Sequence, residues 1–295
     1  MISIIICSVN PVDLQLVRKN IEKTVGVPFE LIAFDNRTTK WGICKVYNQG
    51  IHQAKYDMLC FMHEDIEIQT TNWGEKIMHI FNAHPEIGIA GVAGGGYKAL
   101  APSGWYCLEF ENPHISFQNI IQGYKSSDRD DVHAYHNPYN ESLADVVCVD
   151  GVWLCVRKSI AQRTMFDEKL LTGFHGYDID FCLGVFGRER IVVTYDILMR
   201  HSSEGNFNKA WLDEILKVHK KWNAYLPLTT SKVSETEIYF TEKRALKKVI
   251  EQMREWKYTF RQIQRILLNT ISSRRMPIRL FFKGYIHLLK ETWKS

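Results

Sequence analysis

The sequence predicts an α/β fold in which helices flank a mixed, mostly parallel sheet and a helical extension follows. Up to residue 95, short β-branched runs alternate with segments of helical periodicity, which is the pattern of βαβ units. With 45% hydrophobic and 24% charged residues, the 295-residue chain has the composition of a globular protein with a sizeable core. Beyond residue 225 the pattern becomes basic and helical.

The elements of the first half follow one another regularly. Residues 2–9 form a β-branched run, which predicts a strand buried on both faces. Asn10 and Pro11 then fit a helix cap and a first-turn proline, and apolar residues recur at helical spacing up to residue 25. Further strands are predicted over residues 29–34, 58–62 and 87–92, and helices over residues 43–54 and 73–83.

The second half starts with a segment of different composition. Residues 91–138 are rich in glycine, proline and polar side chains, which indicates long inserted loops of the kind that line substrate sites. Strands are then predicted over residues 146–156 and 191–195, and helices over residues 157–163, 178–186 and 207–222.

Polar side chains follow three of the predicted strands. They are Ser8 and Asn10, Asp35 and Asn36, and His63, Glu64 and Asp65. In open α/β sheets, ligands bind outside the carboxyl ends of the strands. These groups are suited to hold a nucleotide and a metal ion.

Six short motifs occur in order along residues 1–225. They are His63-Glu64-Asp65, the run from Val149 through Asp150 and Gly151 to Arg157, Phe166-Asp167-Glu168, Tyr177-Asp178-Ile179-Asp180, His201 to Gly205, and Lys221-Trp222. Together they resemble the motifs of family 2 glycosyltransferases with the GT-A fold. The last two motifs resemble the HxSxG and KW motifs near the end of the domain in prokaryotic members. His63 stands at the first position of the family's DxD motif, which makes this an HxD variant. The resemblance implies a catalytic domain over residues 1–225, with a nucleotide-binding half over 1–95 and an acceptor half over 96–225.

The resemblance also implies an inverting, hexosyltransferase-type enzyme. It would move a sugar from a nucleotide-sugar donor, preferably UDP-linked, to a hydroxyl of a glycan or lipid-linked acceptor in polysaccharide biosynthesis. A divalent cation, Mn²⁺ or Mg²⁺, would stabilise the leaving diphosphate. Asp65 is the first expected metal ligand, and His63 and His201 are further ligands or phosphate contacts, because Mn²⁺ accepts carboxylate and imidazole. Glu64 is expected to point to the opposite face of the strand.

Asp178, Asp35 and the turn at Asp150 and Gly151 take their roles from the same resemblance, whereas the other site residues are expected from their place at strand ends or from their ring chemistry. Asp178 matches the general base that deprotonates the acceptor hydroxyl, and Asp180 is expected to cap the helix or to hold a neighbour in place. Asp35 matches the residue that contacts the base of the nucleotide. The donor site is expected to include Ser8, Asn10 and Asn36, and the walls around the donor sugar and the acceptor are expected to include Trp105, Asp150, Gly151, Trp153 and Asp180.

Structural interpretations of the same residues stay open. The acidic groups after the second strand and at the helix start fit a turn and a helix cap, and the two tryptophans fit core packing. Because His63 replaces the usual Asp, a transferase of the same fold that works without metal is one alternative. A catalytically silent domain that binds a sugar nucleotide or recruits partners at a membrane is the alternative outside enzymes.

The start of the chain and its cysteines indicate a cytosolic protein. No basic residue precedes the apolar run at residues 2–9, so a secretory signal is not expected. No apolar run reaches the length of about 18 residues that a transmembrane helix needs. Seven scattered cysteines without a CxxC pair indicate reduced thiols in the core.

Residues 226–295 predict a basic amphipathic helical tail. Residues 241–295 carry 14 Lys and Arg against 4 Asp and Glu, whereas residues 1–240 carry 23 against 29. Apolar residues recur at three-and-four spacing over 242–268 and again over 278–289, so two helices are expected. We expect this tail to bind an anionic membrane surface, which would place a bacterial enzyme at the inner face of the cytoplasmic membrane.

Two other partners are open for the apolar face of the tail. It could pack on the catalytic domain, or on a second copy of the chain in a homodimer. Nucleic acid is not an expected partner, because no recognised binding motif accompanies the charge.

Overall fold

The computed structural model describes residues 1–109, 113–125, 129–205 and 207–293. The helices are α1 (Pro11–Thr24), α2 (Asn36–Thr39), α3 (Ile43–Gln53), α4 (Trp73–Ala83), α5 (Lys158–Thr164), α6 (Tyr177–Val185), α7 (Lys209–Trp222), α8 (Glu235–Glu255), α9 (Phe260–Ser272), α10 (Ile278–Trp293) and the 3-10 helix η1 (Pro113–Ile115). The strands are β1 (Ile2–Ser8), β2 (Phe29–Asp35), β3 (Met58–Met62), β4 (Ile66–Ile68), β5 (Ile87–Gly91), β6 (Ala93–Gly95), β7 (Tyr97–Lys98), β8 (Ser116–Gln122), β9 (Val132–His136), β10 (Leu143–Asp145), β11 (Cys148–Val149), β12 (Trp153–Arg157), β13 (Arg190–Thr194), β14 (Met199–His201) and β15 (Leu228–Thr229).

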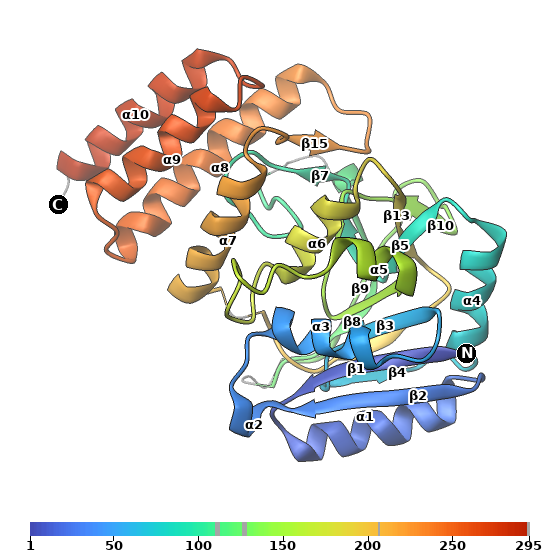
Figure 1. Cartoon of the computed structure of the whole chain (residues 1–295). Coiled ribbons are helices and arrows are strands. Elements are labelled where there is room, and N and C mark those ends of the chain that lie inside the picture. Colours follow the sequence, from blue (N-terminus) through green and yellow to red (C-terminus); the bar gives the residue numbers. More distant parts are fainter. Residues whose placement is uncertain (110–112, 126–128, 206, 294–295) are drawn as a thin grey trace.

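The centre of the fold is a seven-stranded sheet in the order β10-β13-β5-β12-β3-β1-β2 (Figure 1). β1 pairs in parallel with β2 and β3, and β13 pairs in parallel with β5. β12 runs antiparallel between β3 and β5, and β10 is antiparallel to β13. The direction of β1 is therefore shared by every strand of this sheet except β10 and β12, which confirms the predicted mixed, mostly parallel arrangement.

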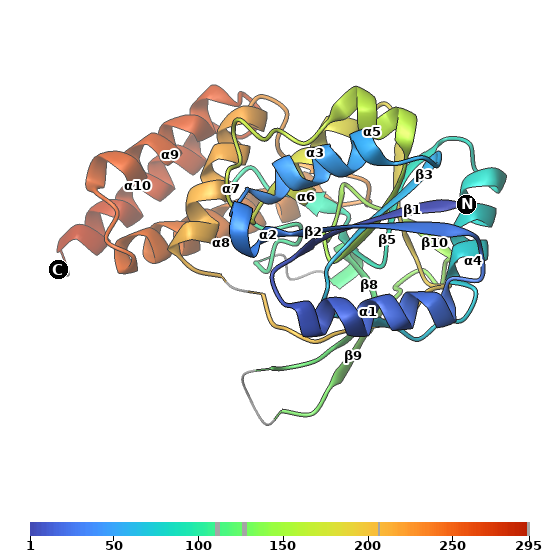
Figure 2. The ribbon, with the colours of Figure 1, turned by 60° about the horizontal axis from the view of Figure 1, so that its bottom comes forward.

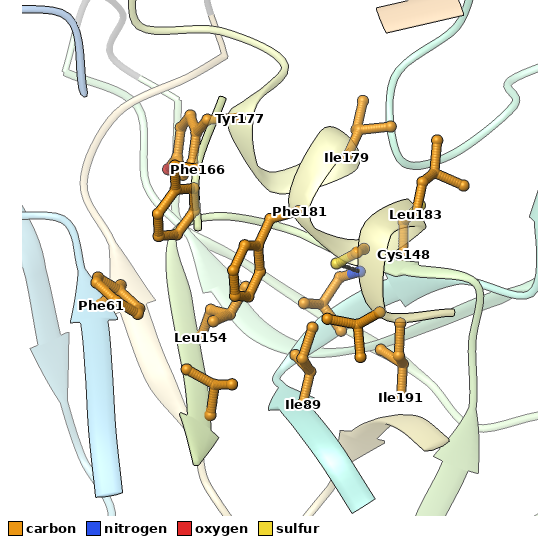
Figure 3. Close-up of a cluster of buried hydrophobic side chains, with 14 of the residues drawn as sticks. Phe61, Ile89, Cys148, Leu154, Phe166, Tyr177, Ile179, Phe181, Leu183 and Ile191 are labelled. Carbon is orange, nitrogen blue, oxygen red and sulfur yellow. Dashed lines mark hydrogen bonds between the residues drawn. The ribbon is translucent and has the colours of Figure 1, made fainter. Parts of the chain in front are cut away.

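Hydrophobic side chains fill both faces of this sheet. On β1, Ile5 belongs to the core formed with α3, α5 and α6, whereas Ile4 and Ile6 belong to the core formed with α1 and α4. This alternation is the period of two that a strand imposes on its side chains. Figure 2 shows α3 and α5 on one side of the sheet and α1 on the other. Figure 3 shows the first core, in which the rings of Phe166 and Phe181 stack with their centroids 4.4 Å apart.

The segment predicted as long loops, residues 91–138, contains β6, β7, β8 and β9. β6 and β9 both pair antiparallel with β8, and β14 pairs with β8 in parallel. With β4 and β11, these strands form a second sheet beside the first. The glycine-rich and polar composition did not reveal this sheet, because several of its strands pair with partners far away in the chain, such as β6 with β11 and β8 with β14.

The single strand predicted over residues 146–156 is interrupted. The structure has β11, a turn at Asp150 and Gly151, and then β12. β11 pairs with β6 in the second sheet, whereas β12 pairs with β3 and β5 in the first. The chain therefore changes sheets at this turn. The seven cysteines are free, as predicted.

The C-terminal segment folds into α8, α9 and α10, which pack on one another and on the rest of the chain (Figure 1). The one helix predicted over residues 242–268 is two helices, because the chain turns between them and Lys257 takes a left-handed φ of 59°. The predicted apolar face is buried: Leu246, Ile250, Met253, Ile263 and Leu267 share a core with Tyr97 and Leu212. Within the described residues, none of the helices combines the length and apolar character that crossing a bilayer requires.

Candidate active site

A cluster of two histidines and an aspartate lies where the central sheet meets the second sheet. His63 directly follows β3, Asp65 precedes β4, and His201 ends β14. β14 pairs antiparallel with β4 and places His201 opposite Ile66, beside Asp65. His201 Nε2 lies 3.5 Å from Asp65 Oδ1, and His63 Nδ1 lies 4.0 Å from the same oxygen. One ligand atom from each residue lies within 4.8 Å of the others.

Tyr177 sets the orientation of His63. Its hydroxyl donates to Gly151 O at 3.1 Å and lies 3.0 Å from His63 Nε2. Because the single hydroxyl proton is committed to Gly151, we assign the proton of the neutral ring to Nε2, which then donates to Tyr177. Nδ1 is left with its lone pair facing Asp65. A lone pair facing a carboxylate is repulsive unless a cation lies between them, so this arrangement suits a metal ion.

The protonation states of the cluster also suit a cation. Burial lowers the pKa of His63, and the neighbouring His201 lowers that pKa further, so the ring is neutral at neutral pH. Burial alone would raise the pKa of Asp65, but hydrogen bonds and charge from His201, with a hydrogen bond from Ser203, hold it well below its usual value. Neutral imidazole and ionised carboxylate are the states that bind divalent cations. His63 and Asp65 are therefore in the states that bind a metal such as Mn²⁺, and His201 offers a third ligand atom beside them.

Asp178 lies at the start of α6, beside the turn between β11 and β12. Gly151 N donates to Asp178 Oδ2 at 3.1 Å. Burial, followed by the charge of Asp150, raises the pKa of Asp178 to about 7. A carboxyl group that titrates near neutrality can accept a proton and release it again, as a general base must. Residue 151 has to be glycine, because a Cβ there would collide with the Tyr177 hydroxyl.

A pocket of about 530 Å³ opens at this edge of the sheet. Of the predicted site residues, its lining includes Asn10, His63, Asp65 and His201. His63 in this lining contacts the hydroxyl of Tyr177, and that hydroxyl donates to Gly151 O. Gly151 N in turn donates to Asp178, so the pocket lining and Asp178 are connected through these two residues. The volume is in the range of small-molecule and cofactor sites.

Glu64 ties the end of β1 to the turn after β3. Its carboxylate accepts from Ser8 Oγ at 2.6 Å and from the backbone N of Val9 and Asn10 at 3.0 Å each. Asn10 also caps α1, where its side chain accepts from Val12 N. Ser8 and Asn10 therefore help to shape the pocket edge, and Glu64 is occupied by the chain itself.

Asp35 and Asn36, the other two expected donor contacts, make the contacts of a turn. Asp35 is exposed and forms two hydrogen bonds with the Arg37 side chain, which lower the pKa of Asp35 to about 2. Asn36 is buried, and its amide group bonds the backbone of Trp41 and the side chain of Thr39. Their side chains are thus engaged with the segment that follows β2.

Three expected wall residues have structural contacts. Trp153 is completely buried and packs edge-to-face on Trp73, with ring centroids 5.8 Å apart, so its assignment to a wall is corrected to the core. Trp105 is partly buried and packs against the core that contains Phe166 and Phe181. Asp180 accepts from Trp222 Nε1 at 2.7 Å and pairs with Lys221 Nζ at 2.9 Å, which holds α7 against α6.

The structure adds two residues that sequence analysis missed. Lys125 lines the pocket, and its Nζ lies 3.0 Å from Asp13 Oδ2 and 3.5 Å from Asp65 Oδ2. No motif surrounds Lys125, so the sequence carried no signal for it. His175 also lines the pocket, and its only signal was its place three residues before Asp178.

Solved structures with a similar fold are glycosyltransferases. S. aureus TarS 1-349 in complex with UDP-GlcNAc matches with a TM-score of 0.54 and 12% identity, over 98% of this chain and 88% of that one. GalNAc-T7 with UDP, GalNAc and Mn²⁺ matches with a TM-score of 0.52 and 12% identity, over 83% of this chain and 50% of that one. At these identities the similarity shows the fold, which is GT-A. A search of curated protein sequences gave no match.

A family model described as a glycosyltransferase-like family matches residues 3–225. The matched range contains the cluster of His63, Asp65 and His201 together with Asp178, and it ends before the three C-terminal helices. On this match across most of its length, the chain belongs to the glycosyltransferase-like family.

Proposed function

We propose that the chain is an inverting, metal-dependent glycosyltransferase that moves a hexose from a UDP-linked donor to a hydroxyl of a glycan or lipid-linked acceptor. The observation that carries the proposal is the convergence of His63, Asp65 and His201 at the pocket, with Tyr177 linking them to the turn at Asp178. The TarS and GalNAc-T7 structures, which contain UDP or UDP-GlcNAc and, in GalNAc-T7, Mn²⁺, support the choice of donor and metal.

The residues of the site divide the work of transfer. A divalent cation held by His63, Asp65 and His201 would offset the charge that grows on the leaving diphosphate. Lys125, which pairs with Asp65 in the free protein, supplies a further positive charge at the same place. Asp178 accepts the proton of the acceptor hydroxyl as its oxygen attacks the anomeric carbon opposite the diphosphate. Displacement in one step inverts the configuration at that carbon.

Nucleotide binding with and without metal tests this proposal. We would measure thermal stabilisation and calorimetric binding for UDP, GDP, dTDP and CMP, each with and without Mn²⁺. We expect UDP to stabilise the unaltered protein only when Mn²⁺ is present. In His63→Ala and in His201→Ala, Mn²⁺ should no longer increase this stabilisation. His79→Ala, which removes an exposed histidine of α4, is the matched control.

Two other results would point elsewhere. Equal UDP binding with and without metal would favour a transferase that works without a cation. Binding of none of the four nucleotides under either condition would contradict the proposed donor class and leave the catalytically silent domain as the better interpretation.

A further inference from the structure

An exposed apolar stripe runs along the outer side of α10. It consists of Ile278, Phe282, Ile286 and Leu289. Their spacing of four, four and three places them on one face of the helix, and their exposed fractions lie between 40% and 61%. Leu280 and Leu288 belong to the other face, which is buried against α8 and α9. The α10 stripe is therefore additional to the apolar face that holds the helices together.

The chain around the α10 stripe is basic. Residues 256–290 contain eight Lys and Arg and no Asp or Glu. All eight basic side chains are exposed, and within the described part of the chain we find none of them in an ion pair with a carboxylate. Arg279, Lys283 and Lys290 each directly follow a residue of the stripe, so they line one of its edges.

This combination of apolar and basic groups selects one kind of partner. In a two-fold dimer with antiparallel α10 helices, the edge formed by Arg279, Lys283 and Lys290 would face the same basic edge of the second copy. Nucleic acid would neutralise the charges but leave the four apolar side chains in water. An anionic lipid surface accepts both, since apolar side chains enter the boundary between headgroups and acyl chains while basic groups stay at the phosphates.

We propose that the α10 stripe and its basic edge dock the protein on an anionic lipid surface, with α10 lying parallel to the membrane. Figures 1 and 2 show α8, α9 and α10 together at the end of the molecule away from the N-terminus. The periodic face that the sequence indicated over residues 242–268 is buried and plays no part in this contact. The docking surface is independent of the proposed donor and metal.

Co-sedimentation of the full chain with lipid vesicles tests the proposal. We expect the protein to bind phosphatidylcholine vesicles that contain phosphatidylglycerol, to bind pure phosphatidylcholine vesicles weakly, and to be released by salt. The double variant Phe282→Ser/Ile286→Ser should lower the partition coefficient on acidic vesicles at least about tenfold. Lys283→Glu/Lys290→Glu should lower it on acidic vesicles and leave the weak binding to neutral vesicles unchanged.

Leu16→Ser on α1 and Lys220→Glu on α7 are matched controls, because both change exposed side chains outside the C-terminal helices. They should bind like the unaltered protein. Circular dichroism should show that the double variants remain folded, since all four altered positions are exposed.

Equal binding to both vesicle types, or full binding by Phe282→Ser/Ile286→Ser, would overturn the proposal. The proposal would also be overturned if light scattering shows that the unaltered protein is a dimer and that Phe282→Ser/Ile286→Ser is a monomer. The α10 stripe would then bind a second copy of the chain.

Discussion

Tyr177 reaches both parts of the candidate site with one hydroxyl group, which contacts His63 Nε2 and donates to Gly151 O. Tyr177→Phe keeps the ring in its aromatic surroundings but removes both contacts. Because His63 then loses the partner that orients its ring, we expect the affinity for Mn²⁺ to fall about ten- to hundredfold, as measured by calorimetry.

Tyr195→Phe is the matched control for this measurement. It also removes a hydroxyl that donates to a backbone carbonyl, that of His136, but at a place outside the pocket lining. Its affinity for Mn²⁺ should equal that of the unaltered protein. If Tyr177→Phe also binds Mn²⁺ normally, the orientation of His63 is set by other contacts.

Asp178 is the residue on which turnover should depend. Asp178→Asn cannot accept the proton of the acceptor hydroxyl, so turnover of a UDP-sugar should fall roughly 10²–10⁴-fold while donor binding persists. In the unaltered protein, kcat/KM should rise with pH through about 7, because only the ionised carboxylate acts as a base. A rate that does not change between about pH 6 and pH 8 would argue against Asp178 as the base.

The raised pKa of Asp178 also has a consequence for stability. Its ordinary value is 3.8 and its value in the folded chain is about 7, so between these values the folded state binds more protons than the unfolded state. The contribution of Asp178 to the free energy of unfolding is therefore lost progressively as the pH rises through this window. Asp178→Asn should raise Tm, by about 2–4 °C for each kcal/mol recovered, and by more near pH 8 than near pH 5. Equal shifts at both pH values in thermal unfolding would contradict this origin.

Among the elements, those bounded by clear changes of polarity were predicted best. β3 and α4 have the predicted bounds, since a continuous apolar run and a helical period each end at polar residues. The break between β11 and β12 was not predicted, because apolar residues continue on both sides of Asp150 and Gly151. What separates the two strands is their pairing in different sheets, and pairing is a property of the folded chain.

The candidate site was predictable in part for the same reason. His63 and Asp65 follow a strand end, so their place at the sheet edge could be read from the order of elements. The contact of Tyr177 with His63 depends on the distance between α6 and the end of β3. Lys125 reaches Asp65 from a loop after β8. Neither contact leaves a pattern in the sequence.

Glu242 joins α8 to the segment after β7. It is fully buried, and it accepts from Tyr97 Oη at 2.5 Å, Leu100 N at 2.7 Å and Ala101 N at 2.9 Å. Glu242→Ala removes the acceptor of two buried backbone N–H groups, and each such loss costs about 1–3 kcal/mol. We expect the free energy of unfolding in urea to fall by at least about 2 kcal/mol.

Glu255→Ala is the control for this prediction, because Glu255 is an exposed carboxylate at the other end of the same helix. Its free energy of unfolding should stay within about 0.5 kcal/mol of the unaltered value. A similarly small effect of Glu242→Ala would show that water can replace the buried carboxylate.

For the whole molecule, the core that residues 1–225 share with the C-terminal helices predicts one cooperative unit. Leu246, Met253 and Leu267 are buried together with Tyr97 and Leu212. Thermal unfolding followed by circular dichroism and by tryptophan fluorescence should therefore give one coincident transition. Two separate transitions would show that the helices unfold on their own. Removal of residues 234–295 should lower Tm, because it would expose Tyr97 and Leu212 to water.

The hydroxyl of Tyr177 also has a consequence for the order of binding. Energetic coupling between two sites is reciprocal, so a change in cation affinity caused by an acceptor equals the change in acceptor affinity caused by the cation. An acceptor that shifts the start of α6 would also move Tyr177, and the Tyr177 hydroxyl contacts the ring of His63. If that shift raises the affinity for a cation at His63, the cation raises the affinity for the acceptor by the same factor.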